Sequence, residues 1–308
     1  MSSSTLTPMM QQYMETKEQY KDCILFYRLG DFYEMFFDDA LTVTKELDIT
    51  LTGKNCGLEE RAPMCGVPYH AVEGYLTRLV QKGYKVAICE QVEDPKLAKG
   101  IVKREVVRIV TPGTNINTQA LDETKNNYIM CIVYIADRYG LSVADVSTGD
   151  YFVTELDSGR KLLDEIAKFS PSEIICNESL YMSGLDLEDL KNRLGITIYS
   201  LDAWYFDDGM CTKVLKDHFK VSSLEGLGLT DYNCGLIAAG ALLQYLYETQ
   251  KTSLAHLTGI ISYTTGKYML LDSSSRRNLE LCETLREKQK RGSLLWRRMH
   301  TNLFCNFL

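Results

Sequence analysis

The stretch "LGDFYEMFFDDA", residues 29–40, carries the most distinct local pattern in the chain. Asp31 and Glu34 have the Asp-x-x-Glu spacing of a helix capping box, and apolar residues then recur at helical spacing. We therefore predict a helix over residues 31–48, with Phe32 opening its buried stripe. The alternative is that Phe32 and Glu34 are presented to a ligand, and the local pattern alone does not decide between the two.

Helices and strands alternate around this segment. We predict helices at 9–21 and 71–82, strands at 23–29, 48–54, 84–92 and 103–113, and a turn-rich connection at 55–71. These elements make a mixed α/β domain of residues 1–115, which ends at the sequence Thr111-Pro112-Gly113.

A second α/β domain is predicted for residues 124–250. Three β-rich runs separated by turn residues indicate an antiparallel meander at its start. After the meander we predict helices at 159–168, 185–194 and 230–250 and strands at 172–177 and 196–201. Residues 253–296 begin a third region that is too short to close its own core, and residues 297–308 have no pattern that we can assign.

The composition is that of a soluble globular protein, with 45% hydrophobic and 24% charged residues. A net charge of -7 argues, as a bulk figure, against a nucleic-acid binder. The local charge of residues 96–108 is positive, because this window contains one acidic residue, Glu105, and five basic ones. The basic residues are Lys96, Lys99, Lys103, Arg104 and Arg108. This basic stripe is a candidate phosphate contact, and an edge strand protected by lysines is the competing interpretation.

Cysteine and histidine spacing gives no sign of a metal site. The ten cysteines include no C-x-x-C pair and the four histidines are far apart, so we expect no zinc site. Cysteines scattered through apolar runs indicate reduced thiols and a cytoplasmic location. We expect neither a secretory signal nor a membrane span, since no apolar run approaches roughly 18 residues.

Three long motifs carry a family resemblance: "FYRLGDFYEMFFDDA", "PMCGVPYHAVEGYLTRLVQKGYKVAICEQVEDP" and "REVVRIVTPGT". In this order they resemble the mismatch-recognition domain of the bacterial MutS family. Two further stretches, "LDSSSRRNLEL" and "KRGSLLW", look like the opening of that family's helical core domain. The resemblance covers residues 1 to 296. It implies a mixed α/β mismatch-recognition domain, then an RNase H-like connector domain, then the beginning of the helical core.

For function, the resemblance implies DNA mismatch repair through binding of mispaired bases and small insertion or deletion loops. In the family the aromatic residue of a Phe-x-Glu motif enters the minor groove and stacks on the mispaired base, while the glutamate contacts that base. These positions correspond to Phe32 and Glu34, which the predicted helix start would hold in place. A second set is expected near the groove or the backbone: Met64, Tyr69, His70, Lys99, Arg104 and Arg108. For His70 and the two arginines, packing and bracing roles are the alternatives.

The partners implied by the resemblance are mismatched duplex DNA, MutL and, in the full-length family, a second copy of the chain. Full-length members are ABC-type ATPases that use ATP and Mg2+. This sequence contains no G-x-x-x-x-G-K-[ST] phosphate loop. We therefore expect no ATPase domain and no cofactor in this chain. The resemblance further implies a nucleoid-associated cytoplasmic location. We also expect weak or undetectable DNA binding by the chain alone, and a non-native tail after Trp296, where the sequence stops resembling the family.

Two other functions remain open. An RNase H-like, metal-dependent nuclease would use Asp145 and Asp150 as paired carboxylates, although aspartates beside Ser, Thr and Gly are usually turn formers. A module that docks MutL without binding DNA is the third possibility.

Overall fold

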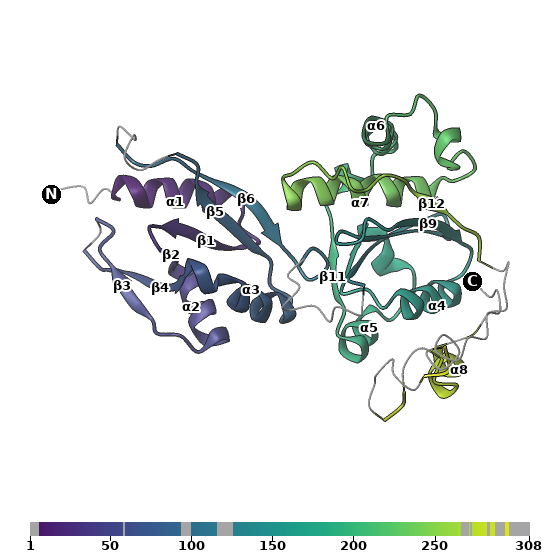
Figure 1. Cartoon of the computed structure of the whole chain (residues 1–308), viewed down its shortest axis with the longest axis horizontal. Coiled ribbons are helices and arrows are strands. Elements are labelled where there is room, and N and C mark those ends of the chain that lie inside the picture. Colours follow the sequence, from purple (N-terminus) through teal and green to yellow (C-terminus); the bar gives the residue numbers. More distant parts are fainter. Residues whose placement is uncertain are drawn as a thin grey trace.

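The computed structural model describes residues 6–57, 59–93, 100–115, 126–265, 271, 273–281, 284–286 and 293–295. These residues form two six-stranded sheets with helices on both faces of each. Figure 1 shows the two sheets one after the other along the long axis of the molecule, which is horizontal in the view. The predicted mixed α/β class is confirmed for both. Lys99 and the tail at 297–308 lie outside the described residues.

The first sheet has the strand order β3-β4-β2-β1-β5-β6. Its strands are β1 (Ile24–Leu29), β2 (Phe32–Phe36), β3 (Thr52–Lys54), β4 (Ala62–Pro68), β5 (Val86–Gln91) and β6 (Arg104–Val110). Helix α1 (Pro8–Gln19) packs on one face, and α2 (Phe37–Leu47) and α3 (Val72–Gln81) pack on the other (Figure 1). Strand β1 pairs with β5 in parallel, and the pairs β1–β2, β2–β4, β3–β4 and β5–β6 are antiparallel.

The predicted helix over 31–48 is wrong in its first part. Residues 32–36 form strand β2, and the helix starts only at Phe37. Strands β1 and β2 make a hairpin across Gly30, whose φ of +59° suits a tight turn. Burial then alternates along β2: Phe32 is exposed, Tyr33 is buried, and Glu34 is half-buried. Glu34 is therefore no capping residue, because the strand gives it a different set of neighbours.

The turn-rich connection at 55–71 also contains an element that we did not predict. Strand β4 runs through it between β3 and β2, and it pairs Gly66 with Glu34 and Pro68 with Phe32. A single-turn 3-10 helix, η1 (Tyr69–Ala71), follows directly and leads into α3. The second half of the expected loop is thus part of the sheet that holds Phe32 and Glu34.

The second sheet has the strand order β11-β10-β7-β8-β9-β12. Its strands are β7 (Tyr128–Ile135), β8 (Arg138–Asp145), β9 (Tyr151–Leu156), β10 (Glu173–Cys176), β11 (Thr197–Ser200) and β12 (Ile261–Ser262). The predicted meander is confirmed, because β7, β8 and β9 pair antiparallel. Strands β10, β11 and β12 add in parallel to their neighbours. Part of this sheet therefore comes from the chain beyond residue 250.

Helices cover both faces of the second sheet. Helices α4 (Gly159–Phe169) and α5 (Leu187–Leu194) lie on one face, and α6 (Asp208–Phe219) and α7 (Cys234–Gln250) lie on the other (Figure 1). The remaining described helices are the short η2 (Glu178–Met182), η3 (Ala203–Phe206), η4 (Leu224–Leu227) and α8 (Ser273–Asn278). Helix α7 is buried along almost its whole length, as its apolar sequence predicts. Within the described residues, no helix combines the length and the apolar character that crossing a bilayer requires.

Candidate nucleic-acid interface

Phe32 lies at the start of β2, beside the hairpin turn, with 46% of its surface exposed. Its neighbours across the sheet are Leu29 and Pro68. A Cβ added to Gly66 would be 3.8 Å from Phe32 Cδ1 and 3.7 Å from Glu34 Cγ. The glycine backbone thus lies directly beside both side chains. Phe32 and Glu34 share one face of the sheet, because alternate residues of a strand point to the same side.

Glu34 has a charged partner that the sequence did not reveal. Lys54, at the end of the edge strand β3, places its Nζ 2.5 Å from Glu34 Oε2. The two side chains are 32% and 17% exposed, respectively, and the same ammonium lies 5.6 Å from the centre of the Phe36 ring. The carboxylate beside Phe32 is therefore already compensated by a cation in the free protein.

Tyr69 and His70, which we predicted near the groove, belong to η1. This turn lies beside the hairpin between β1 and β2. The backbone N–H of Tyr69 donates to the carbonyl oxygen of Asp31 at 3.0 Å. The exposed Tyr69 ring is covered on one side by the Arg28 guanidinium, 3.9 Å from the ring centre. The His70 ring meets Tyr69 edge-on at 5.8 Å. The turn after β4 and the turn after β1 thus form one exposed end of the sheet.

Met64 has a supporting position in this arrangement. It lies opposite Phe36 on β4 and is half-buried, packed against the core that α1 covers. Its carbonyl oxygen accepts a hydrogen bond from the Thr52 hydroxyl at 3.1 Å. Met64 therefore joins the strands under the site.

The two predicted phosphate contacts on β6 lie on opposite faces of the first sheet. Arg104 is on the α1 side, where its Nε donates to the Arg28 carbonyl at 2.7 Å and its Nη1 donates to Gln12 Oε1 at 3.1 Å. Arg108 is on the α3 side, where its Nη2 lies 3.4 Å from Glu73. A single flat surface cannot contact both guanidinium groups. The geometry favours the bracing alternative for Arg104.

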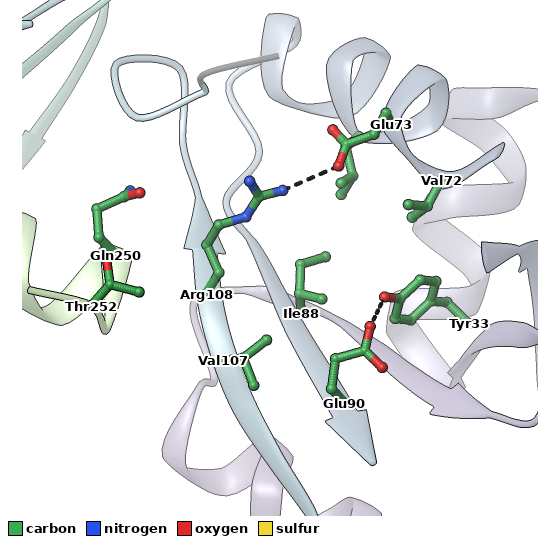
Figure 2. A pocket seen from close by; sticks show the side chains of 10 residues that line it. Tyr33, Val72, Glu73, Ile88, Glu90, Val107, Arg108, Gln250 and Thr252 are labelled. Atoms are coloured by element: carbon green, nitrogen blue, oxygen red, sulfur yellow. Dashed lines mark hydrogen bonds and ion pairs between the residues drawn. The ribbon is translucent and has the colours of Figure 1, made fainter. Parts of the chain in front are cut away.

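Arg108 also lines a cavity of about 440 Å³ between the two sheets. Figure 2 shows its ion pair with Glu73 and, deeper in the first sheet, the Tyr33 hydroxyl donating to the Glu90 carboxylate. Burial, reinforced by the Glu90 carboxylate, raises the pKa of Tyr33. Since Tyr33 points away from the face that carries Phe32, this cavity is separate from the exposed end of the sheet.

The aspartates of the nuclease alternative have the geometry of turn residues. Asp145 is fully buried and accepts hydrogen bonds from the backbone N–H groups of Asn127 at 3.0 Å and Ser147 at 2.8 Å. Asp150 accepts from the Thr148 hydroxyl at 3.0 Å. Across the described part of the chain, no three His, Cys, Asp or Glu side chains are grouped to hold a metal ion.

Comparison with known proteins matches both sheets to one family. The family model of MutS domain I matches residues 7–119, and that of MutS domain II matches residues 127–258. The chain is 70% identical over 291 residues to the DNA mismatch repair protein MutS of Lachnoclostridium phytofermentans, covering 94% of this chain and 31% of that protein.

Proteins of the same name from two other bacteria give a similar result. The identity is 55% over 295 residues for Ruminiclostridium cellulolyticum and 53% over 296 residues for Acetivibrio thermocellus. Each alignment covers 95% of this chain, but only 33% and 34% of the respective relative. The chain therefore spans about a third of the length of these relatives. With both domain models matched in order and this degree of identity, the chain belongs to the MutS family and carries its domains I and II.

Proposed function

We propose that this chain recognises mispaired bases and small insertion or deletion loops in duplex DNA, as a part of mismatch repair. Phe32 would stack on the mispaired base from the minor groove, and Glu34 would contact the same base. The observation that carries this proposal is the exposed Phe32 ring at a hairpin turn, beside a carboxylate on the same face of the sheet. The name of the relatives supports the same conclusion.

Phe32 would contribute to binding by stacking on a base. A mispair is weakly stacked and easily kinked, so an apolar side chain can replace part of the lost base stacking. One aromatic–base stack contributes about 1–3 kcal/mol. Because Phe32 contributes little to the core, this free energy is available for binding rather than for folding.

The charge of Glu34 is balanced by Lys54. An isolated carboxylate at this position would repel the phosphates of any duplex. The ion pair with Lys54 compensates that charge before DNA arrives. We infer that Lys54 exchanges its partner from Glu34 to a phosphate when DNA binds, which leaves the carboxylate free for a mispaired base. On matched DNA the carboxylate gains no such contact, so the exchange is unfavourable there.

For the longer proteins that this chain resembles, we propose ATP and Mg2+ as cofactors and MutL and a second copy as partners. The residues of this chain do not fit the nucleotide or its metal. The sequence has no phosphate-loop motif, and its described residues hold no cluster of metal-binding side chains. We therefore assign no step of recognition to either group.

The experiment is a titration of the purified chain against a matched duplex and a duplex with one mispair, at low salt. We expect a preference for the mispair that Phe32→Ala removes while the circular dichroism spectrum is unchanged. Leu41→Ala is the matched control, because Leu41 is 47% exposed on α2, on the other side of the first sheet. Equal binding of both duplexes by the wild type, or an unfolded Phe32→Ala variant, would contradict the proposal.

A further inference from the structure

Glu173 is a buried carboxylate at the start of β10, at the junction of the two sheets. Its Oε2 accepts hydrogen bonds from the Thr111 hydroxyl at 2.5 Å and from the Gly113 backbone N–H at 2.8 Å. Its Oε1 accepts from the Tyr245 hydroxyl of α7 at 2.6 Å. Thr111 and Gly113 belong to the segment that leaves the first sheet, so one carboxylate joins that segment to two elements of the second. We call these four residues the Glu173 cluster.

The backbone at Gly113 approaches the second sheet too closely for any side chain. A Cβ at this position would lie 2.7 Å from Ile129 Cβ and 3.0 Å from Glu173 Oε2. Real Cβ atoms do not approach a packed carbon at the first of these distances. Glycine is thus required for the N–H to reach the carboxylate.

Asn127 fixes the chain where the second sheet begins. Its side-chain Nδ2 donates to the carbonyl oxygens of Pro112 and Asn115, both at 3.0 Å. Its backbone N–H donates to Asp145 Oδ2 at 3.0 Å. The chain is therefore held against the second sheet both before and after residues 116–125. The length of that segment does not set the distance between the sheets.

Further contacts support the same junction. Lys85, between α3 and β5, places its ammonium 4.3 Å from the centre of the Tyr199 ring on β11. The Tyr199 hydroxyl donates to the Gly83 carbonyl at 3.4 Å. These groups lie next to the Glu173 cluster, since Lys85 Nζ is also 5.8 Å from the Tyr245 ring centre.

We propose that Glu173 is a positioning residue, which fixes the sheet that carries Phe32 to the second sheet through Thr111 and Gly113. The orientation of the recognition site relative to the second sheet is then set at this cluster and not by residues 116–125. The consequence for mismatch recognition rests on the proposed function, whereas the geometric claim does not.

The test measures the distance between two spin labels on the intact chain by double electron–electron resonance. The labels are attached through non-natural amino acids at positions 41 and 182, which are exposed on α2 and η2. We expect a narrow distance distribution for the wild type and a broad one for Glu173→Ala. Glu173→Gln should restore the narrow distribution, because its oxygen can accept from Thr111 and Gly113 while its amide donates to the Tyr245 hydroxyl.

A change in linker length provides the matched control. Insertion of roughly six Gly/Ser residues between positions 120 and 121 adds flexible coil. We expect this insertion to leave the wild-type distribution unchanged and to broaden the distribution of Glu173→Ala further. Broadening by the insertion alone, or a narrow distribution in Glu173→Ala, would overturn the proposal.

If Glu173→Ala does not fold, Thr111→Val takes its place, because it removes one linker donor while keeping the side-chain shape. An unchanged distribution in a folded Thr111→Val with the insertion would likewise refute the positioning role. Mismatch binding of Phe32→Ala is measured in parallel. If Phe32→Ala keeps the wild-type preference for the mispair while the distances are as expected, the proposed function alone is rejected. If the distances differ from those expected while Phe32→Ala loses the preference that the wild type shows, the positioning role alone is rejected.

Discussion

Replacing Glu34 with glutamine is expected to strengthen binding to matched DNA by releasing Lys54. The substitution keeps the size of the side chain and a hydrogen-bonding amide, but it removes the charge that holds the ammonium at 2.5 Å. Lys54 is then free to contact a phosphate of any duplex. On a mispaired duplex, Lys54 of the wild type is proposed to contact a phosphate already. The substitution should therefore change the affinity for that duplex little.

The size of the effect follows from counterion release. One additional phosphate contact steepens the plot of log K against log salt concentration by about 0.9 on double-stranded DNA. Between roughly 200 and 50 mM salt, this slope corresponds to about a 3.5-fold further gain in affinity for the matched duplex. The ratio of mismatched to matched affinity should fall by the same factor.

Fluorescence anisotropy at several salt concentrations, with a matched duplex and a duplex with a single mispair, measures both slopes. Glu46→Gln is the matched control, because it breaks a comparable ion pair with Lys82, 2.7 Å long, on the opposite side of the first sheet. That variant should leave both slopes unchanged.

A double variant, Glu34→Gln with Lys54→Met, distinguishes two causes of the higher affinity for matched DNA. If the gain comes from a released Lys54, Glu34→Gln should have no effect in a Lys54→Met background. An equal gain in that background would show that the carboxylate itself repels matched DNA. A matched-DNA slope identical to that of the wild type would refute the partner exchange outright.

Further predictions concern stability and thiol chemistry. Gly140→Ala should destabilise the second sheet by more than about 3 kcal/mol in urea denaturation, because the new Cβ would lie 2.0 Å from the Cys234 carbonyl oxygen; a loss below 1 kcal/mol, roughly the scale of a tolerated core substitution, would contradict that packing. Burial raises the pKa of Glu173 above its ordinary value of 4.5, beside Lys85, Tyr199 and Tyr245, so the folded state keeps the proton longer than the unfolded state. The free energy of unfolding should therefore fall as the pH rises above 4.5, by at most about 1.4 kcal/mol per pH unit, and Glu173→Gln should remove that part of the slope. Ellman's reagent should react rapidly with no more than two of the ten thiols of the native protein, since eight are buried and Cys282 and Cys305 lie outside the described residues; a native count above two would disprove this.

Periodicity predicted most of the elements because most of them are locally encoded. The meander, the apolar helix α7 and helices α1 and α3 all lie within a few residues of their predicted bounds. The segment at Phe32 fails because its local sequence satisfies two patterns at once. Asp31 and Glu34 have capping-box spacing, yet the hairpin at Gly30 and the pairing with β4 make the segment a strand. These pairings depend on residues far along the chain, and a local window does not contain them.

Strand β4 was not predicted, because the composition of this segment resembles that of a loop. Pro63 and Pro68 made the segment look like a loop, since proline is rare inside central strands. They occupy the second and the last position of β4, between β3 and β2. Only the strands on either side, which the local sequence does not specify, allow a segment of this composition to pair.

Two contacts between residues far apart in sequence were not predicted, because a local window does not contain both partners. Lys54 is 20 residues from Glu34 in sequence, and Thr111 is 62 residues from Glu173. Nothing in the sequence around Lys54 indicates Glu34 as its partner, because it is simply a basic residue in a short strand. Glu173 did give a signal, because a single acidic residue opens the otherwise apolar run "EIIC", and such a carboxylate needs donors when it is buried.

Helix α1 leaves the Phe32 end of the first sheet uncovered, and this bears on the shape of the proposed ligand. Helix α1 packs over β1, β5 and the inner end of β2, but it does not reach the Phe32 end, where the aromatic ring projects from the surface. The cavity between the two sheets lies elsewhere, and Phe32 does not line it. The exposed Phe32 ring is thus placed differently from the lining of a concave pocket that usually holds a small molecule. In the proposed complex the partner supplies the recess that takes this ring, as a minor groove opened at a mispair would.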